Sequence, residues 1–95
     1  MKEIERLVRS DAWDRSTKVA FYAWLDKPMR DTARLGYCER KAGFMMRDEK
    51  PAKLRAAERL LDWAIAKFAT ADKETLSLAR ITRGMIRSAL TRQCK

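Results

Sequence analysis

Residues 51–69 carry their apolar side chains at the spacing of one face of an α-helix. These apolar residues are Leu54, Ala57, Leu61, Ala64, Ile65 and Phe68. Side chains three or four positions apart lie on the same side of a helix, so all six fall within one narrow arc. Pro51 begins the segment at a position where its missing N–H costs no hydrogen bond. The pattern therefore predicts an amphipathic helix that must bury its apolar face against other elements.

Helical spacing recurs in the rest of the 95-residue chain. We expect a short helix over residues 2–9, a second over 12–25, a third from Asp26 or Pro28 to about residues 43–46, the segment 51–69 as the fourth, and a fifth over about 73–91 that Thr70 or Asp72 caps. Apolar and polar residues never alternate for long, and no Asn-Gly or Asp-Gly hairpin turn occurs, so no strands are expected. Short connections favour antiparallel neighbours. The sequence predicts an all-α fold: one domain over residues 1–95, a small antiparallel helical bundle of about five helices, three longer and two short N-terminal ones.

The helices on either side of segment 51–69 also present apolar faces. In the second expected helix, Trp13, Phe21 and Trp24 share one side and are expected in the core. In the fifth, the inward side is expected to hold Leu78, Ala79, Thr82, Met85, Ile86 and Ala89.

The residue types present leave little room for catalysis. Histidine is absent, which removes the usual general base, the Ser-His and Cys-His pairs and most metal sites. Cys38 and Cys94 follow no disulfide or zinc spacing and are expected to be free thiols, although a link between them stays open. No glycine-rich phosphate loop occurs. We expect a protein that is not an enzyme and that uses no metal and no cofactor.

Nothing in the sequence indicates a membrane protein. No run of about 18 apolar residues is present, and the first nine residues mix both charges, unlike a signal peptide. A basic helix lying on an anionic membrane is a weaker possibility, because the fifth expected helix lacks Trp and Phe. A cytoplasmic location is expected.

The net charge of +9 is the strongest global signal in the sequence. It predicts attraction to polyanions. The charge is uneven, because no acidic residue follows Glu74 while five basic residues do. They are Arg80, Arg83, Arg87, Arg92 and Lys95.

Arg80, Arg83 and Arg87 form what we call the arginine ridge. On a helix they lie within about 60° of one another and opposite the apolar face. No glutamate stands four residues before any of them, so we expect an uncompensated cationic row, extended by Arg92 and Lys95. Guanidinium groups bind phosphate through paired hydrogen bonds, so a nucleic-acid backbone fits such a row. The alternative is a solvated helix face, since basic residues are favoured near helix C-termini.

Two further sets of residues are candidates for binding. Arg30, Arg34, Tyr37 and Lys41 align on one side of the third expected helix, where a base can stack on an aromatic ring; alternatively, Tyr37 lies at the edge of the core. Trp63 projects opposite the apolar face of segment 51–69, with Arg59 and Lys67 one turn away on either side. It is either an anchor for a partner or packed beneath an N-terminal helix.

The leading hypothesis is a small basic nucleic-acid-binding domain that reads the phosphate backbone. The alternative is an inhibitor or adaptor that docks on a nucleic-acid-processing complex, such as a nuclease or a CRISPR complex. In style, though not in any motif, the chain resembles the short, basic, helical proteins that phages and mobile elements encode. The choice between DNA and RNA, the sequence specificity, the protein target, the oligomeric state and any role of the two cysteines stay open.

Overall fold

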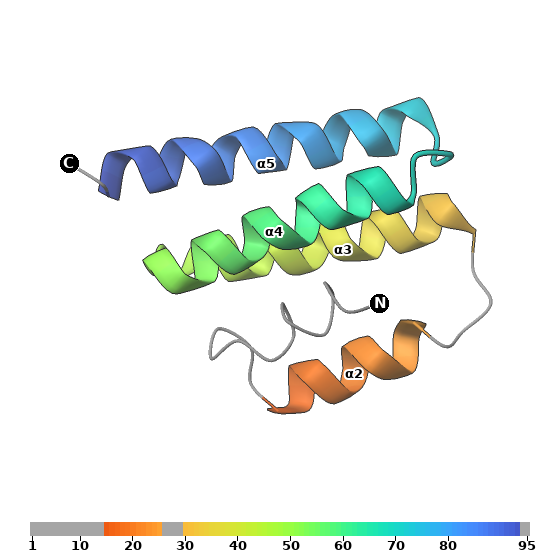
Figure 1. Cartoon of the computed structure of the whole chain (residues 1–95), viewed down its shortest axis with the longest axis horizontal. Helices are drawn as coiled ribbons and strands as arrows, with labels where there is room; N and C mark the ends of the chain where they lie inside the picture. The colour runs from red at the N-terminus through yellow and green to blue at the C-terminus, as the bar shows by residue number, and fades with distance from the viewer. Residues whose placement is uncertain (1–14, 26–29, 94–95) are drawn as a thin grey trace.

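The computed structural model describes residues 15–25 and 30–93, and every regular element in these ranges is an α-helix. The four helices are α2 (Arg15–Leu25), α3 (Asp31–Arg47), α4 (Pro51–Lys67) and α5 (Lys73–Gln93) (Figure 1). The predicted all-α fold is confirmed. The expected helix over residues 2–9 lies outside the described residues, as do residues 26–29, where the third helix was expected to begin.

Helices α3, α4 and α5 form a three-helix bundle in which each helix contacts the other two. Successive helices run in opposite directions, and α2 lies along the far side of the bundle from α5 (Figure 1). The connections between the three helices are short, residues 48–50 and 68–72. Such short connections make antiparallel packing the available arrangement.

Helix α4 is buried over a wider arc than its sequence predicts. Leu54, Ala57, Leu61, Ala64 and Phe68 are buried as expected, whereas Ile65 is half-buried. Ala56 and Leu60, which the prediction left outside the apolar arc, are also buried. Because α4 packs on both α3 and α5, more than one side of it faces other helices. One narrow apolar arc predicts burial on one side of a helix, which suits a helix with one neighbour. Helix α4 has two neighbours and is buried on more than one side.

Aromatic rings join α2 to α3. Phe21 and Trp24 are buried, as the sequence predicts, and Trp24 stacks on Tyr37 with 4.2 Å between ring centroids. The Phe21 ring lies 5.3 Å from that of Trp24 and 6.2 Å from that of Tyr37. One stacked pair and two tilted pairs at these distances give a compact aromatic cluster. Trp13, expected in the same cluster, lies outside the described residues.

Hydrogen bonds fasten the α4–α5 connection to the first turn of α3. Asp72 caps α5 as expected: its Oδ1 accepts the backbone N–H of Thr75 at 2.8 Å. Hydrogen bonds from the side chain and then the backbone of Thr75 hold the pKa of Asp72 below its ordinary value. The Asp72 N–H donates to Thr32 Oγ1 at 3.0 Å, and the Thr70 hydroxyl donates to Asp31. Residues about forty positions apart are thereby joined at one end of the bundle.

The buried Cys38 thiol lies in the core of the bundle and is free. Burial raises its pKa to about 12, so the thiolate is scarce at neutral pH and the side chain behaves as a small apolar residue. Cys94 lies outside the described residues.

The expected inward face of α5 is wrong at two positions. Ala79, Thr82, Ile86 and Ala89 are buried, but Leu78 and Met85 are half exposed. The buried side of α5 is set by its contacts with α3 and α4. It is narrower than the apolar side of the helix.

Candidate binding surface on α4 and α5

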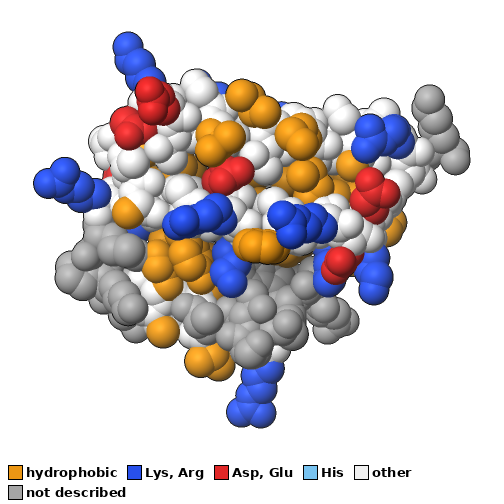
Figure 2. All heavy atoms as spheres, turned by 180° about the vertical axis from the view of Figure 1, so that it is seen from behind, with side chains coloured by type: hydrophobic (Ala, Val, Ile, Leu, Met, Phe, Trp, Pro, Cys, Tyr) orange, Lys and Arg blue, Asp and Glu red, His pale blue; other side chains and the backbone are white. Residues whose placement is uncertain are grey.

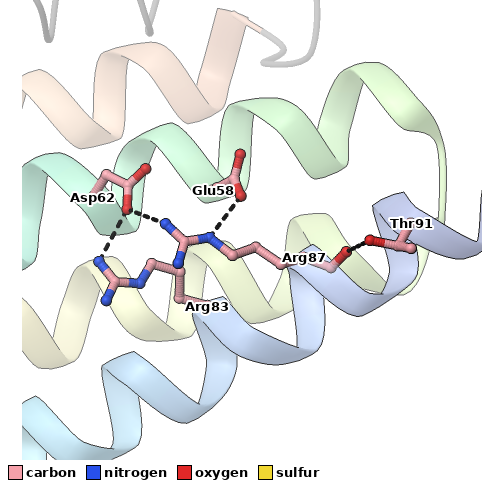
Figure 3. A network of polar contacts seen from close by, with 5 residues as sticks. All are labelled: Glu58, Asp62, Arg83, Arg87 and Thr91. Carbon is pink, nitrogen blue, oxygen red and sulfur yellow. Dashed lines mark hydrogen bonds and ion pairs between the residues drawn. The ribbon is translucent and has the colours of Figure 1, made fainter. Parts of the chain in front are cut away.

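The arginine ridge lies on one continuous helix, within α5, as predicted. Two of its three guanidinium groups reach across to α4 and bind carboxylates (Figure 3). Arg83 Nη1 donates to Asp62 Oδ1 at 3.0 Å. Arg87 bridges two acids: its Nε donates to Glu58 Oε2 at 2.9 Å and its Nη2 to Asp62 Oδ1 at 3.2 Å. One turn further along α5, the Thr91 hydroxyl donates to the backbone carbonyl of Arg87 at 2.9 Å.

The expectation of an uncompensated ridge is therefore wrong for Arg83 and Arg87. The acids that compensate them come from the preceding helix, not from α5 itself. Glu58 and Asp62 are four residues apart, as are Arg83 and Arg87, so each pair occupies one side of its helix. In an antiparallel hairpin the two pairs meet in opposite order. That matched spacing is the sequence signal that could have predicted the network.

Arginine remains in excess on the outer surface of α4 and α5. Arg80 is exposed, and so are Arg55 and Arg59 on α4. Within the described residues, none of these three arginines forms an ion pair with a carboxylate. Arg55 and Arg59 each stand three residues before one of the two acids, and so lie next to it on the helix. We define the α4/α5 basic surface as five arginines of these two helices together with Glu58 and Asp62. The five arginines are Arg55, Arg59, Arg80, Arg83 and Arg87.

The ion pairs of this surface are partly open to solvent. The side chains of Arg87 and Asp62 are 52% and 45% exposed, and those of Arg83 and Glu58 are 24% and 27% exposed. Exposed ion pairs contribute only about 0.2–1 kcal/mol each. An external anion with two or more oxygens that accept hydrogen bonds can therefore compete with Glu58 and Asp62 for the same guanidinium groups.

The stripe on α3 does not form one open row. Tyr37 is half-buried, with its ring stacked on Trp24 and with Lys41 Nζ 5.6 Å from the ring centroid. Burial holds its pKa above the ordinary value, so the phenol keeps its proton at neutral pH. Arg34 is half-buried, with its guanidinium 6.0 Å from the Phe68 ring centroid. Of the set Arg30, Arg34, Tyr37 and Lys41, only Arg30 is exposed. Tyr37 therefore lies at the edge of the core.

Trp63 is half-buried and packs against the core. Its ring meets that of Phe68 edge to face, with 5.4 Å between centroids. Arg59 and Lys67, one turn away on either side of it, are exposed. The role of Trp63 as an anchor for a partner stays a prediction. Arg92 is exposed in the last turn of α5, and Lys95 lies outside the described residues.

The described residues contain no group of three acidic, cysteine or histidine side chains suited to a metal ion. None of the four described helices has the length and apolarity to cross a bilayer. Comparisons with protein-family models, with curated proteins and with solved structures give no match.

Proposed function

We propose that this chain is a binding module for the phosphate backbone of nucleic acid, and that the α4/α5 basic surface makes the contact. The excess of arginine on that surface carries the proposal: five guanidinium groups stand against two carboxylates. The net charge of +9 adds long-range attraction to any polyanion. Binding of this kind needs no catalytic group.

The ion pairs give the proposed contact a specific form. Arg80 to Arg87 spans about 10 Å along the helix, a length that follows neighbouring phosphates of one strand. Glu58 and Asp62 hold Arg87 and Arg83 in a fixed orientation until phosphate takes their place. Exchange of a carboxylate partner for a phosphate keeps the guanidinium groups paired throughout. The two acids thus lower the affinity while they hold the ridge in position.

Removing the internal carboxylates is expected to raise the affinity for nucleic acid. Asp62→Asn combined with Glu58→Gln frees Arg83 and Arg87, and each added phosphate contact strengthens binding about fivefold to tenfold near 0.1 M salt. Arg83→Glu should abolish binding, because it places an acid within the ridge. The measurement is fluorescence anisotropy of a labelled oligonucleotide, single-stranded and duplex, at low salt.

Asp48→Asn is the matched control. It raises the net charge by one, as Asp62→Asn does, but Asp48 pairs with Lys53 at the start of α4 and not with the ridge. It should change the affinity by less than about twofold, since only the long-range attraction grows. Absence of oligonucleotide binding by the unmodified chain at low salt would refute the proposal, as would equal effects of Asp48→Asn and Asp62→Asn.

A second candidate is an inhibitor or adaptor module that docks on a nucleic-acid-processing protein complex. The observation that favours it is that Arg83 and Arg87 already bind carboxylates, so an acidic patch on a protein suits them as well as phosphate does. Trp63, with Arg59 and Lys67, would then contribute a partly desolvated contact beside the charged one.

Capture from a native cell lysate separates the two candidates. Under the first, nuclease treatment should remove everything that the immobilised chain retains. Under the second, a protein should remain bound after nuclease treatment and in high salt, and Trp63→Ala should weaken its retention. Trp63→Ala should leave the affinity for oligonucleotide within about twofold of that of the unmodified chain. Truncating a side chain that lies outside the contact changes the binding free energy little.

A further inference from the structure

One flank of α5 carries apolar side chains that the core leaves uncovered. Leu78, Ile81 and Met85 are 50%, 60% and 52% exposed. With three exposed polar residues of the same helix, they follow one another at steps of four and three residues. This is the spacing of a coiled-coil seam. We call these six residues the α5 seam: Glu74, Leu78, Ile81, Met85, Ser88 and Arg92.

The α5 seam lies on the face formed by α3 and α5, away from the flank of α5 that contacts Glu58 and Asp62. Figure 2 looks at the molecule from behind the view of Figure 1, and apolar side chains gather on its upper half. A hollow beside the seam is lined in part by Met46, Ile81 and Met85. Several exposed apolar side chains in one row are typical of a surface that another molecule covers.

The seam is complementary to itself. If a second α5 runs antiparallel along the first, Ile81 meets Met85, Leu78 meets Ser88 and Glu74 meets Arg92, each pair occurring twice. These pairs follow from the numbering alone, because the six positions are symmetric about position 83. We propose that the α5 seam is the contact between two copies of this chain, related by a two-fold axis near the level of residue 83. Contacts of this kind are the commonest in homodimers.

The charges at the ends of the seam select the direction of pairing. Glu74 begins it and Arg92 ends it, and within the described residues neither forms an ion pair. Antiparallel pairing sets each Glu74 beside an Arg92 of the other copy. Parallel pairing would set Glu74 beside Glu74 and Arg92 beside Arg92, and like charges across a seam oppose association. Charge complementarity therefore identifies a second copy, in one orientation, as the molecule that covers the seam.

The residues beside the seam leave room for a second helix. Ser77 and Gly84 lie next to it on α5, and both are exposed. A Cβ atom placed on Gly84, or on Gly36 or Gly43 of α3, would meet no other atom within 4 Å. Packed helix axes lie about 8 to 10 Å apart, depending on the side chains at the contact, and small residues at its edge do not obstruct that approach. The partner's α5 can then lie close along the seam.

Analytical ultracentrifugation of the full chain tests this contact. Over about 1 to 200 µM, a range suited to moderate interfaces, the mass should rise from 11.1 kDa to twice that value. Ile81→Asp should weaken association more than about tenfold, because it buries a charge at the centre of the seam. The Ile81 side chain is exposed in the isolated chain, so the substitution should leave the fold, as measured by circular dichroism, unchanged. Val19→Asp, at an exposed position on α2, is the control and should leave association unchanged.

A charge exchange tests the orientation. Glu74→Arg alone and Arg92→Glu alone should each weaken the dimer, and the double variant should restore it, because the opposite charges meet again. A monomer at every concentration would overturn the proposal, and so would a dimer that withstands Ile81→Asp or a double variant that fails to recover. A monomer that loses a captured protein through Ile81→Asp would assign the seam to a foreign partner instead. The arginine variants of the basic surface test the proposed function separately, since they lie on the other flank of α5.

Discussion

Raising the salt concentration from about 50 to about 200 mM is expected to weaken oligonucleotide binding on the order of a hundredfold. The reason is that each phosphate bound by an arginine releases condensed counterions, and the logarithm of the affinity falls by about 0.9 per contact for each tenfold rise in salt on duplex. Four contacts suffice for this loss. The arginines of the α4/α5 basic surface provide that number. Titrations at several salt concentrations, by fluorescence anisotropy, measure the slope.

The internal carboxylates make this prediction sharper. In the Asp62→Asn, Glu58→Gln variant the slope should steepen by about 0.9 for each arginine that gains a phosphate contact. Asp48→Asn should leave the slope as it is in the unmodified chain. A slope near zero, with binding retained at high salt, would contradict a backbone contact and favour docking on a protein.

Phe21→Ala is expected to lower the free energy of unfolding by about 3–5 kcal/mol. Phe21 is fully buried, and its ring contacts Trp24 and Tyr37, so the truncation leaves a cavity where α2 meets α3. Domains of this size are stable by only about 5–15 kcal/mol, so the loss is a large share of the total. Urea unfolding followed by circular dichroism gives the value.

Val19→Ala is the control for that experiment. Val19 lies on the same helix and its side chain is 63% exposed, so its truncation should change the stability by less than about 0.5 kcal/mol. If Phe21→Ala were equally mild, the rings of Phe21, Trp24 and Tyr37 would not be what holds α2 against α3.

The fold was predictable because local signals agree with one another along most of the chain. Pro51 at the start of α4, Asp72 at the cap of α5 and the apolar spacing between them mark the helices directly. Which side of a helix is buried was harder to predict. Ala56 and Leu60 became core because α4 has two helical neighbours, and Leu78 and Met85 did not because α5 packs along a narrower side. Which residues of a helix are buried depends on how many other helices pack against it. The spacing of apolar residues within that helix does not give this number.

The candidate site shows the same division. That Arg80, Arg83 and Arg87 share one side of a helix follows from the sequence, because α5 is continuous from Lys73 to Gln93. Their partners did not follow from it. Glu58 lies 29 positions from Arg87, and only the register between α4 and α5 brings the two together. A search for compensating acids within the same helix misses partners on the neighbouring one.

The hydrogen bonds at the start of α3 bear on how the chain folds. They connect Asp31 with Thr70 and Thr32 with Asp72, which are 39 and 40 positions apart. Closing a loop of that length costs conformational entropy, which only the docking of helices across it repays. Helices form within about a microsecond, whereas contacts between distant positions slow folding. The folding rate of this bundle should therefore be set by the docking of the α4–α5 hairpin onto α3.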